Sequence, residues 1–305
     1  MPCHNPLVQQ PLFFLSVNYR SAALLAQLIS SLPLGCQLII VNNSPDDSSV
    51  HGLVDLAEKD QRVVVLDADE NGGFGAGCNL GLDWIYTRSP QALVWLINPD
   101  AQLLPEAEST VRQCFASQPN TAILGTPILD TQGQLWFGSG HFNRWTGAVT
   151  SHHRAISATT LAPTDWVSGC SMVLNLQALG HLPQFDEVYF LYYEDCDLCD
   201  RYRQQGYAIA LTPIPLVSHA VSSITSRHTQ AKYEHATFSK LMFLHRRATP
   251  LALGLNIIYL LTQALWLGLH NRASALGRWI GFKRFLTAAF SPVEIARTHA
   301  NHPQP

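Results

Sequence analysis

Residues 93–100 read L-V-W-L-I-N-P-D, an apolar run that ends in three turn-forming residues. Such a run is typical of a strand that is buried on both faces of a parallel sheet. Asn98, Pro99 and Asp100 then favour a turn. A carboxylate at the carboxyl end of a strand can bind a hard cation that bridges phosphates, although a simple strand-to-turn stop also explains these residues.

The sequence before this strand alternates between short apolar runs and segments with helical spacing. This alternation predicts an α/β fold with a mostly parallel sheet covered by helices. We expect strands at 12–18, 38–41 and 62–66, and helices at 21–30, 50–59 and 76–86. Ligands of such sheets bind outside the carboxyl ends of the strands, where this chain has Asn18, Asn42–Asn43, 67–71 and 98–100.

The second half has shorter apolar runs and more glycine-rich turns. It predicts strands at 123–129, 135–139, 148–150, 166–174, 207–211 and 216–219, with a helical turn near 176–179.

Composition excludes a disordered chain, because 47% of the 305 residues are hydrophobic and 13% are charged. The formal net charge of −3 is unevenly distributed: residues from Val221 onward carry ten Lys/Arg and two Glu, which leaves nine basic and twenty acidic residues before them. An acidic body does not suit nucleic acid, whereas a basic, apolar tail suits an anionic membrane. The seven scattered cysteines and an N-terminus without signal-peptide features predict a cytoplasmic protein with reduced thiols.

A glycine-rich segment, N-G-G-F-G-A-G at 71–77, lies between a predicted strand and a predicted helix. It lacks the full G-x-G-x-x-G fingerprint and the Lys-Ser/Thr of a P-loop. Its glycines permit a close approach of backbone to a ligand, and the helix N-terminus can receive phosphate. A tight turn alone would require the same glycines.

An acidic segment, F-L-Y-Y-E-D-C-D-L-C-D-R at 190–201, places Glu194, Asp195, Asp197 and Asp200 directly behind aromatic residues. Burial beside rings raises the pKa of a carboxyl group, and a helix that begins at 194–195 favours acids in its first turn. An acidic turn on a surface helix is the alternative interpretation.

Eight blocks in a fixed order resemble the family 2 glycosyltransferases, most of all the rhamnosyltransferase-like group that builds bacterial polysaccharides. The resemblance covers residues 12–225. The blocks are V-N-Y (17–19), I-V-N-N-S-P-D-D-S (40–48), N-G-G-F-G-A-G-C-N-L-G (71–81), L-I-N-P-D (96–100), W-V-S-G-C-S-M-V (166–173), F-D-E-V-Y-F-L-Y-Y-E-D-C-D-L-C-D-R (185–201), G-Y (206–207) and V-S-H (217–219).

The resemblance implies a GT-A fold, with a Rossmann-like nucleotide-binding sheet and an acceptor-binding half. It implies inverting transfer of a sugar, with rhamnose as first choice, from a dTDP- or UDP-sugar to a glycan or lipid-linked acceptor in polysaccharide or cell-envelope biosynthesis. Asp195 would be the general base, with Glu194 as its competitor. Asp100 and His219 would hold Mg²⁺ or Mn²⁺, and Trp166 and Gly169 would shape the acceptor side. The nucleotide and donor sugar would contact Val17, Asn18, Tyr19, Asn42, Asn43, Asn71, Gly73, Phe74, Asn79 and Asn98.

Two positions depart from the family pattern. Asn42 stands where most relatives have Asp, and Asn98 replaces the first acid of the metal-binding D-x-D. These departures leave open a decayed, non-catalytic relative that binds a nucleotide-sugar or a membrane. A nucleotidyltransferase is a further alternative, but the G-x-G…K loop that it requires does not follow Phe14.

The resemblance ends near residue 225, and residues 226–305 predict a helical, basic and apolar extension. Residues 250–270 have the length of a membrane span. Polar residues interrupt them, so we favour an in-plane amphipathic helix or a core helix packed on residues 1–225. With the basic pairs 246–247 and 283–284, peripheral contact with the cytoplasmic leaflet is the expectation.

Overall fold

The computed structural model describes residues 10–47, 50–152, 160–220 and 229–291. Its first half alternates strands and helices as predicted, and the strands pair in parallel in the order β4-β1-β2-β3. The run at 93–97 is fully buried between its neighbours, which explains its continuous apolar pattern. These elements are β1 (Leu12–Asn18), α1 (Ala22–Ser31), β2 (Gln37–Asn42), α2 (Val50–Lys59), β3 (Val63–Asp67), α3 (Phe74–Arg88) and β4 (Leu93–Ile97).

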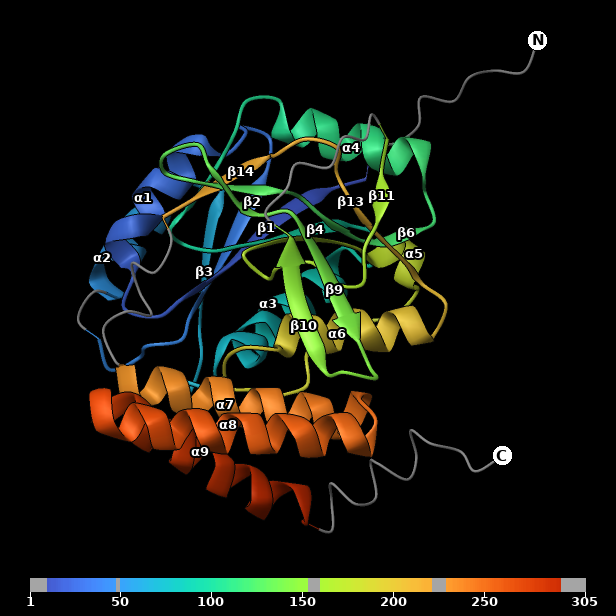
Figure 1. The fold of residues 1–305 in the computed structure, drawn as a ribbon. Coiled ribbons are helices and arrows are strands. Elements are labelled where there is room, and N and C mark those ends of the chain that lie inside the picture. Colours follow the sequence, from blue (N-terminus) through green and yellow to red (C-terminus); the bar gives the residue numbers. More distant parts are fainter. Residues whose placement is uncertain (1–9, 48–49, 153–159, 221–228, 292–305) are drawn as a thin grey trace.

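The second half extends this sheet on the other side of β4. The full order is β11-β13-β6-β12-β4-β1-β2-β3, with β12 antiparallel to both of its neighbours. The sheet is thus mixed but mostly parallel, and helices flank it (Figure 1). The added elements are α4 (Ala107–Ser117), β6 (Thr121–Gly125), β11 (Ala162–Pro163), β12 (Ser171–Asn175), α5 (Leu176–Leu179), α6 (Glu194–Gln204) and β13 (Ala208–Leu211).

The predicted strand at 123–129 is wrong, because the chain leaves the main sheet after Gly125. Pro127 has no N–H to donate to a ladder, and the Thr126 hydroxyl instead accepts a hydrogen bond from the Leu216 N–H at 2.9 Å. The remainder forms β7 (Ile128–Asp130) in a second sheet, β5-β14-β7-β8. Its other strands are β5 (Ala101–Leu103), β8 (Leu135–Phe137) and β14 (Val217–His219).

The predicted strand at 166–174 is also too long at its start. A turn occupies its first residues, in which the Ser171 N–H donates to the Ser168 carbonyl at 3.1 Å. Regular pairing begins only at Ser171, where β12 runs beside β4. The turn brings Gly169 to the edge of the sheet that carries the strand ends.

A hairpin of β9 (Ser139–Asn143) and β10 (Ala148–His152) extends from the sheets to the C-terminal helices (Figure 1). At its tip, the Thr146 carbonyl accepts a hydrogen bond from Asn256 Nδ2 at 3.0 Å.

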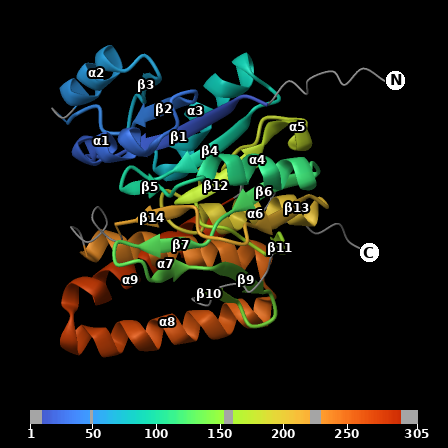
Figure 2. The same ribbon diagram turned by 90° about the horizontal axis from the view of Figure 1, so that it is seen from above.

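Three helices form the end of the described chain: α7 (Thr229–Arg247), α8 (Pro250–His270) and α9 (Arg272–Ala289). They lie together at one end of the molecule (Figure 1), and α8 lies along the outer edge when the protein is seen from above (Figure 2). Buried ion pairs fix α7: Arg246 binds Asp186 and Arg247 binds Asp197, each at 2.9 Å.

Helix α8 is not a core helix, which corrects one of the two expectations for residues 250–270. Within it only Ala252 and Leu260 are buried. By length and composition it could cross a membrane, and it is the one such helix among the residues described. The buried pairs of Arg246 and Arg247 also correct the expectation that these two cations face a membrane.

Candidate functional site

A cavity of about 390 Å³ opens at the edge of the sheet where the parallel strands end. Its walls come from the ends of β1, β2 and β4, the start of α3, strand β14, the segment 190–192 and helix α7. Nine of the residues proposed from the sequence line it: Val17, Tyr19, Asn43, Asn71, Gly73, Phe74, Asn98, Asp100 and His219.

Asp100 and His219 meet at one side of this cavity because β14 pairs antiparallel with β5. That register places His219 opposite Ala101, next to Asp100. His219 Nε2 lies 3.0 Å from Asp100 Oδ1, and both side chains are almost fully buried. The other ring nitrogen, Nδ1, is buried and has no hydrogen-bond partner among the described residues. The pair combines a carboxylate and an imidazole, both of which bind divalent metals.

The glycine-rich segment forms a second wall. Gly73 has a φ of +91°, and a Cβ at this position would lie 2.1 Å from the Phe190 carbonyl oxygen. The Phe74 N–H donates to the same carbonyl at 3.1 Å. Asn43 Nδ2 donates to the Gly73 carbonyl at 2.9 Å and to Asn71 Oδ1 at 3.0 Å. Asn43 Oδ1 remains buried without a partner among the described residues, so it can accept a hydrogen bond from a ligand.

Asn18 and Asn42 lie behind the cavity and do not line it. Both are fully buried, and Asn18 Nδ2 donates to Asn42 Oδ1 at 3.1 Å. Asn42 Nδ2 in turn donates to Asp67 Oδ1 at 2.9 Å. An aspartate at position 42 could not donate a hydrogen bond to Asp67, and its charge would repel the Asp67 carboxylate. The asparagine amide avoids both effects.

Asp195 lies next to the turn that precedes β12. Its Oδ2 accepts from the Gly169 N–H at 3.0 Å and its Oδ1 accepts from the Cys196 N–H at 2.8 Å. Burial raises the pKa of Asp195, and these backbone donors oppose the rise. A Cβ on Gly169 would lie 3.0 Å from the Phe74 ring and 3.7 Å from Asp195 Cβ, so both residues pack next to Gly169.

Glu194 packs against the start of helix α3. It is buried, and its Cβ lies 3.8 Å from where a Cβ on Gly75 would be, so it faces helix α3. Burial and the neighbouring Asp195 raise the pKa of Glu194 well above its ordinary value. Glu194 Oε2 has no hydrogen-bond partner among the described residues. Burial of this kind favours the protonated form of a carboxyl group.

Asn79 and Trp166 also lie outside the cavity lining. Asn79 holds the loop before α6, because its Oδ1 accepts from the Phe185 N–H at 2.7 Å and its Nδ2 donates to the Phe185 carbonyl at 3.0 Å. The Trp166 ring packs on Phe137, with ring centroids 5.1 Å apart. The ring centroids of Trp136 and His219 are 4.8 Å apart, so Trp136 packs beside His219.

Sequence reasoning missed the contribution of α7. Lys232 and His235 line the cavity together with the segment 190–192. The His235 ring stacks on Phe190 at 4.6 Å, and Ser239 Oγ donates to the Leu191 carbonyl at 2.8 Å. Burial lowers the pKa of His235. Two consecutive residues have a positive φ: Tyr192 at 70° and Tyr193 at 67°. The sequence does not indicate this conformation, which is uncommon outside glycine and concentrates at functional sites.

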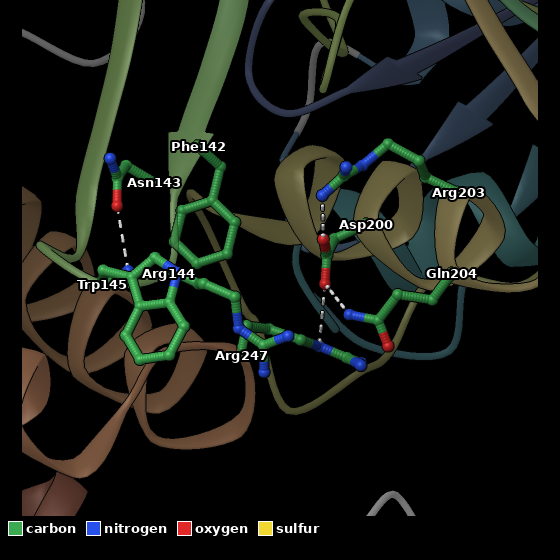
Figure 3. A pocket seen from close by; sticks show the side chains of 8 residues that line it. All are labelled: Phe142, Asn143, Arg144, Trp145, Asp200, Arg203, Gln204 and Arg247. Carbon is green, nitrogen blue, oxygen red and sulfur yellow. Dashed lines mark hydrogen bonds and ion pairs between the residues drawn. The ribbon is translucent and has the colours of Figure 1, made fainter.

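A second cavity of about 420 Å³ lies at the C-terminal end of α6 (Figure 3). Asp200 binds Arg203 at 2.9 Å and Gln204 at 2.6 Å there, and Arg247 lies 3.8 Å from it. Asp197 likewise binds Arg201 and Arg247. Arginines therefore neutralise both carboxylates, which agrees with packing roles. In the described part of the chain no group of three or more His, Cys, Asp or Glu could hold a metal.

Comparison with known proteins agrees with this geometry. Residues 17–166 match the family model described as glycosyl transferase family 2. An N-acetylglucosaminyl-diphospho-decaprenol L-rhamnosyltransferase of Mycobacterium tuberculosis is 25% identical over 238 residues, which is 70% of this chain and 76% of that protein. A low-salt glycan biosynthesis hexosyltransferase of Haloferax volcanii is 23% identical over 199 residues, which is 63% of this chain and 62% of that protein.

Solved structures share the fold at low identity. GalNAc-T7, determined with UDP, GalNAc and Mn²⁺, aligns with a TM-score of 0.61 and 10% identity over 79% of this chain and 48% of that chain. The Pyrobaculum calidifontis mannosyltransferase PcManGT, in complex with GDP-Man and Mn²⁺, aligns with a TM-score of 0.52 and 13% identity over 97% of this chain and 85% of that chain.

Proposed function

The chain is a glycosyltransferase with a family 2 domain and a GT-A fold, and from this premise we propose that it transfers a hexose, rhamnose first, with inversion from a dTDP- or UDP-sugar to a glycan or lipid-linked acceptor. The observation that carries the proposal is the cavity at the strand ends, which has the Asp100–His219 pair in its wall. Asp195 lies outside the lining and accepts from the N–H of Gly169, which packs next to the wall residue Phe74. Rhamnose is favoured because the M. tuberculosis relative is named for rhamnosyl transfer to a diphospholipid-linked sugar.

The donor would occupy the cavity between the glycine-rich segment and the Asp100–His219 pair. Asn43 Oδ1 is available as an acceptor for the nucleotide, and Gly73 allows the backbone to approach the diphosphate. Lys232 is the lysine in the cavity wall and has no ion pair among the described residues. We assign it to the leaving diphosphate, whose negative charge grows as the glycosidic bond breaks.

Asp100 and His219 fit a divalent metal that is shared with a diphosphate. They supply one carboxylate and one imidazole, whose buried Nδ1 has no hydrogen-bond partner among the described residues. A metal site made only of protein side chains would need more ligands than these two. Mg²⁺ or Mn²⁺ held there would offset charge on the departing diphosphate. GalNAc-T7 and PcManGT, which share the fold, were both crystallised with Mn²⁺.

We assign the general base to Asp195. The acceptor hydroxyl would transfer its proton to the carboxylate as its oxygen bonds to the anomeric carbon, and the bond to the diphosphate would break on the opposite side. The Gly169 and Cys196 N–H groups orient Asp195, while burial raises its pKa toward the range useful for a base. Glu194 is the weaker candidate because it packs against α3 and because burial and the neighbouring Asp195 raise its pKa well above its ordinary value.

The acceptor is proposed to be carried by a lipid, with the enzyme at the cytoplasmic face of the membrane. In this proposal residues 1–225 perform transfer, and residues 226–305 form an extension that contacts the membrane peripherally. The acidic body and the basic extension agree with such a division.

A donor titration tests the proposal. Calorimetry of the full chain with dTDP-rhamnose, UDP-glucose and UDP-N-acetylglucosamine, each with and without Mn²⁺, is expected to identify one donor whose affinity depends on metal. Hydrolysis of that donor, or transfer to a diphospholipid-linked sugar, should then be measurable. No binding of any nucleotide-sugar would overturn the proposal and favour a decayed relative.

A further inference from the structure

Helices α8 and α9 present apolar side chains outward. On α8 these residues recur at 251, 255, 258, 259, 265, 266 and 269, which is one face of a helix. The exposed fractions are high for such side chains: 76% for Leu265, 61% for Trp266 and 83% for Leu269. Single exposed apolar residues are ordinary, but a stripe along a whole helix marks an interaction surface.

Helix α9 continues this surface. Its exposed positions include Leu276, Trp279, Leu286 and Phe290, again at helical spacing. The opposite side of α9 is fixed by two glycines, because a Cβ on Gly277 or Gly281 would lie within 2.4 Å of a carbonyl oxygen of α7. Close packing on α7 therefore determines which side of α9 faces outward.

The charges on these two helices identify the occupant. Residues 250–291 contain four Lys/Arg and no Asp or Glu, in contrast to the acidic body. Arg272 and Lys283 are exposed along the same stripe of α9, and Lys283 lies 5.6 Å from the Trp279 ring centroid. Exposed tryptophans and tyrosine beside cations and without acids are the composition of an interfacial membrane helix.

We propose that the outer face of α8 and α9, named here the α8–α9 face, lies in the plane of an anionic lipid bilayer surface. The apolar stripes would enter the headgroup–acyl boundary, and Arg272 and Lys283 would contact lipid phosphates. Trp145, 72% exposed, stands at the hairpin tip that contacts α8 and would join the edge of this face.

The structure favours an in-plane position over a membrane span. α8 packs along α9, and α9 packs along α7. Carrying α8 across a bilayer would draw Arg278, Lys283 and Arg284 of α9 into the hydrocarbon, which is costly. Thr249 and Asn271 also cap the N-termini of α8 and α9, because Thr249 accepts from the Ala252 N–H and Asn271 accepts from the Ser274 N–H.

Flotation of the full chain with vesicles tests this proposal independently of catalysis. Binding is expected to vesicles that contain phosphatidylglycerol, to weaken with salt, and to be poor with phosphatidylcholine alone. Replacing Leu265, Trp266 and Leu269 by Ser should lower the partition coefficient by about tenfold or more. Lys283→Glu should weaken binding only to anionic vesicles.

The matched control is Leu34→Ser, which removes an apolar side chain that is 88% exposed but lies far along the chain from this face. It should bind vesicles as the wild type does, and thermal melts would show that all variants fold. Wild type that ignores anionic vesicles, or a triple variant that binds them unchanged, would overturn the proposal. A wild-type dimer that the triple variant converts to monomer, without vesicle binding, would assign the face to a second copy instead.

Discussion

His219 Nε2 lies 3.0 Å from Asp100 Oδ1, although 119 residues separate the two along the chain. The pairing of β14 with β5 creates this contact, and it places both side chains in the wall of the cavity where the parallel strands end. The second, smaller sheet therefore contributes half of the proposed metal site.

Removing either partner should weaken metal-dependent donor binding. We expect Asp100→Ala and His219→Ala to lower donor affinity by roughly 10- to 100-fold in the presence of Mn²⁺ and to change it little in its absence. Calorimetric titrations with and without the metal measure both values. An equal loss in the two conditions would mean that these residues only support the fold.

Lys232→Ala should reduce the affinity for dTDP or UDP by about 10- to 100-fold, because a charge-assisted contact to the diphosphate is lost. Lys232→Arg should restore most of the affinity, and binding of thymidine or uridine should not change. Equal losses for nucleoside and nucleoside diphosphate would place Lys232 elsewhere. Failure of the wild type to bind any nucleotide would instead count against the proposed function.

Gly73→Ala should impair both folding and donor binding. The added Cβ would meet the Phe190 carbonyl oxygen at 2.1 Å, and the φ of +91° strains any side chain. Gly180 offers a matched control, since its φ is +71° and nothing lies within 4 Å. Gly180→Ala should cost about 1–2 kcal/mol in urea unfolding, the left-handed penalty alone. An equal loss of stability in both variants would show that the contact with the Phe190 carbonyl oxygen does not add to the destabilisation by Gly73→Ala.

Activity should require deprotonated Asp195. Burial raises its pKa, so kcat/KM is expected to fall as the pH decreases through that raised pKa, at a higher pH than for an exposed aspartate. Asp195→Asn should lower the rate by about 10²- to 10⁴-fold and abolish this acid limb. Glu194→Gln should retain the limb, because the limb is assigned to Asp195 and the raised pKa of Glu194 favours its protonated form. The reverse pattern in initial-rate pH profiles would exchange the two roles.

The buried pair of Arg247 and Asp197 should anchor α7. Arg247→Ala is expected to cost about 3 kcal/mol in urea unfolding, since Asp197 is fully buried and would keep only part of its compensation from Arg201. Arg20→Ala, which removes an exposed ion pair with Asp46, should cost less than about 1 kcal/mol. Comparable losses for the two variants would argue against α7 as an anchored element.

The first half of the fold was predictable because each strand from Leu12 to Ile97 is a mainly apolar run, with Ser16 as an interruption in β1, followed by polar residues. Those local signals, together with the family resemblance, also identified nine of the residues that line the cavity. The turn at Pro127 was readable in principle, since proline interrupts a ladder. Local periodicity does not report which strand β14 would join, so the Asp100–His219 distance was not predictable from spacing.

The contribution of α7 was beyond sequence reasoning for a related reason. Helical spacing at 229–247 indicates a buried face, but it does not say that Lys232 and His235 line the cavity at the strand ends while Arg247 reaches Asp197. Likewise, the sequence alone suggests that Asn42 has lost the charge of the family's Asp, whereas its amide donates a hydrogen bond to Asp67. Long-range contacts decide these functions, and a single sequence carries little record of them.

The stacking of His235 on Phe190 has a practical consequence for anyone who trims this protein. A chain shortened before residue 229, as the end of the family resemblance near residue 225 would suggest, would lose one side of the cavity in which we propose that the nucleotide-sugar binds. Such a shortened protein would also leave the buried Asp197 without Arg247 and would expose the cluster that α7 forms with Tyr189. Solubility should instead be sought by altering the outermost helices, with α7 retained.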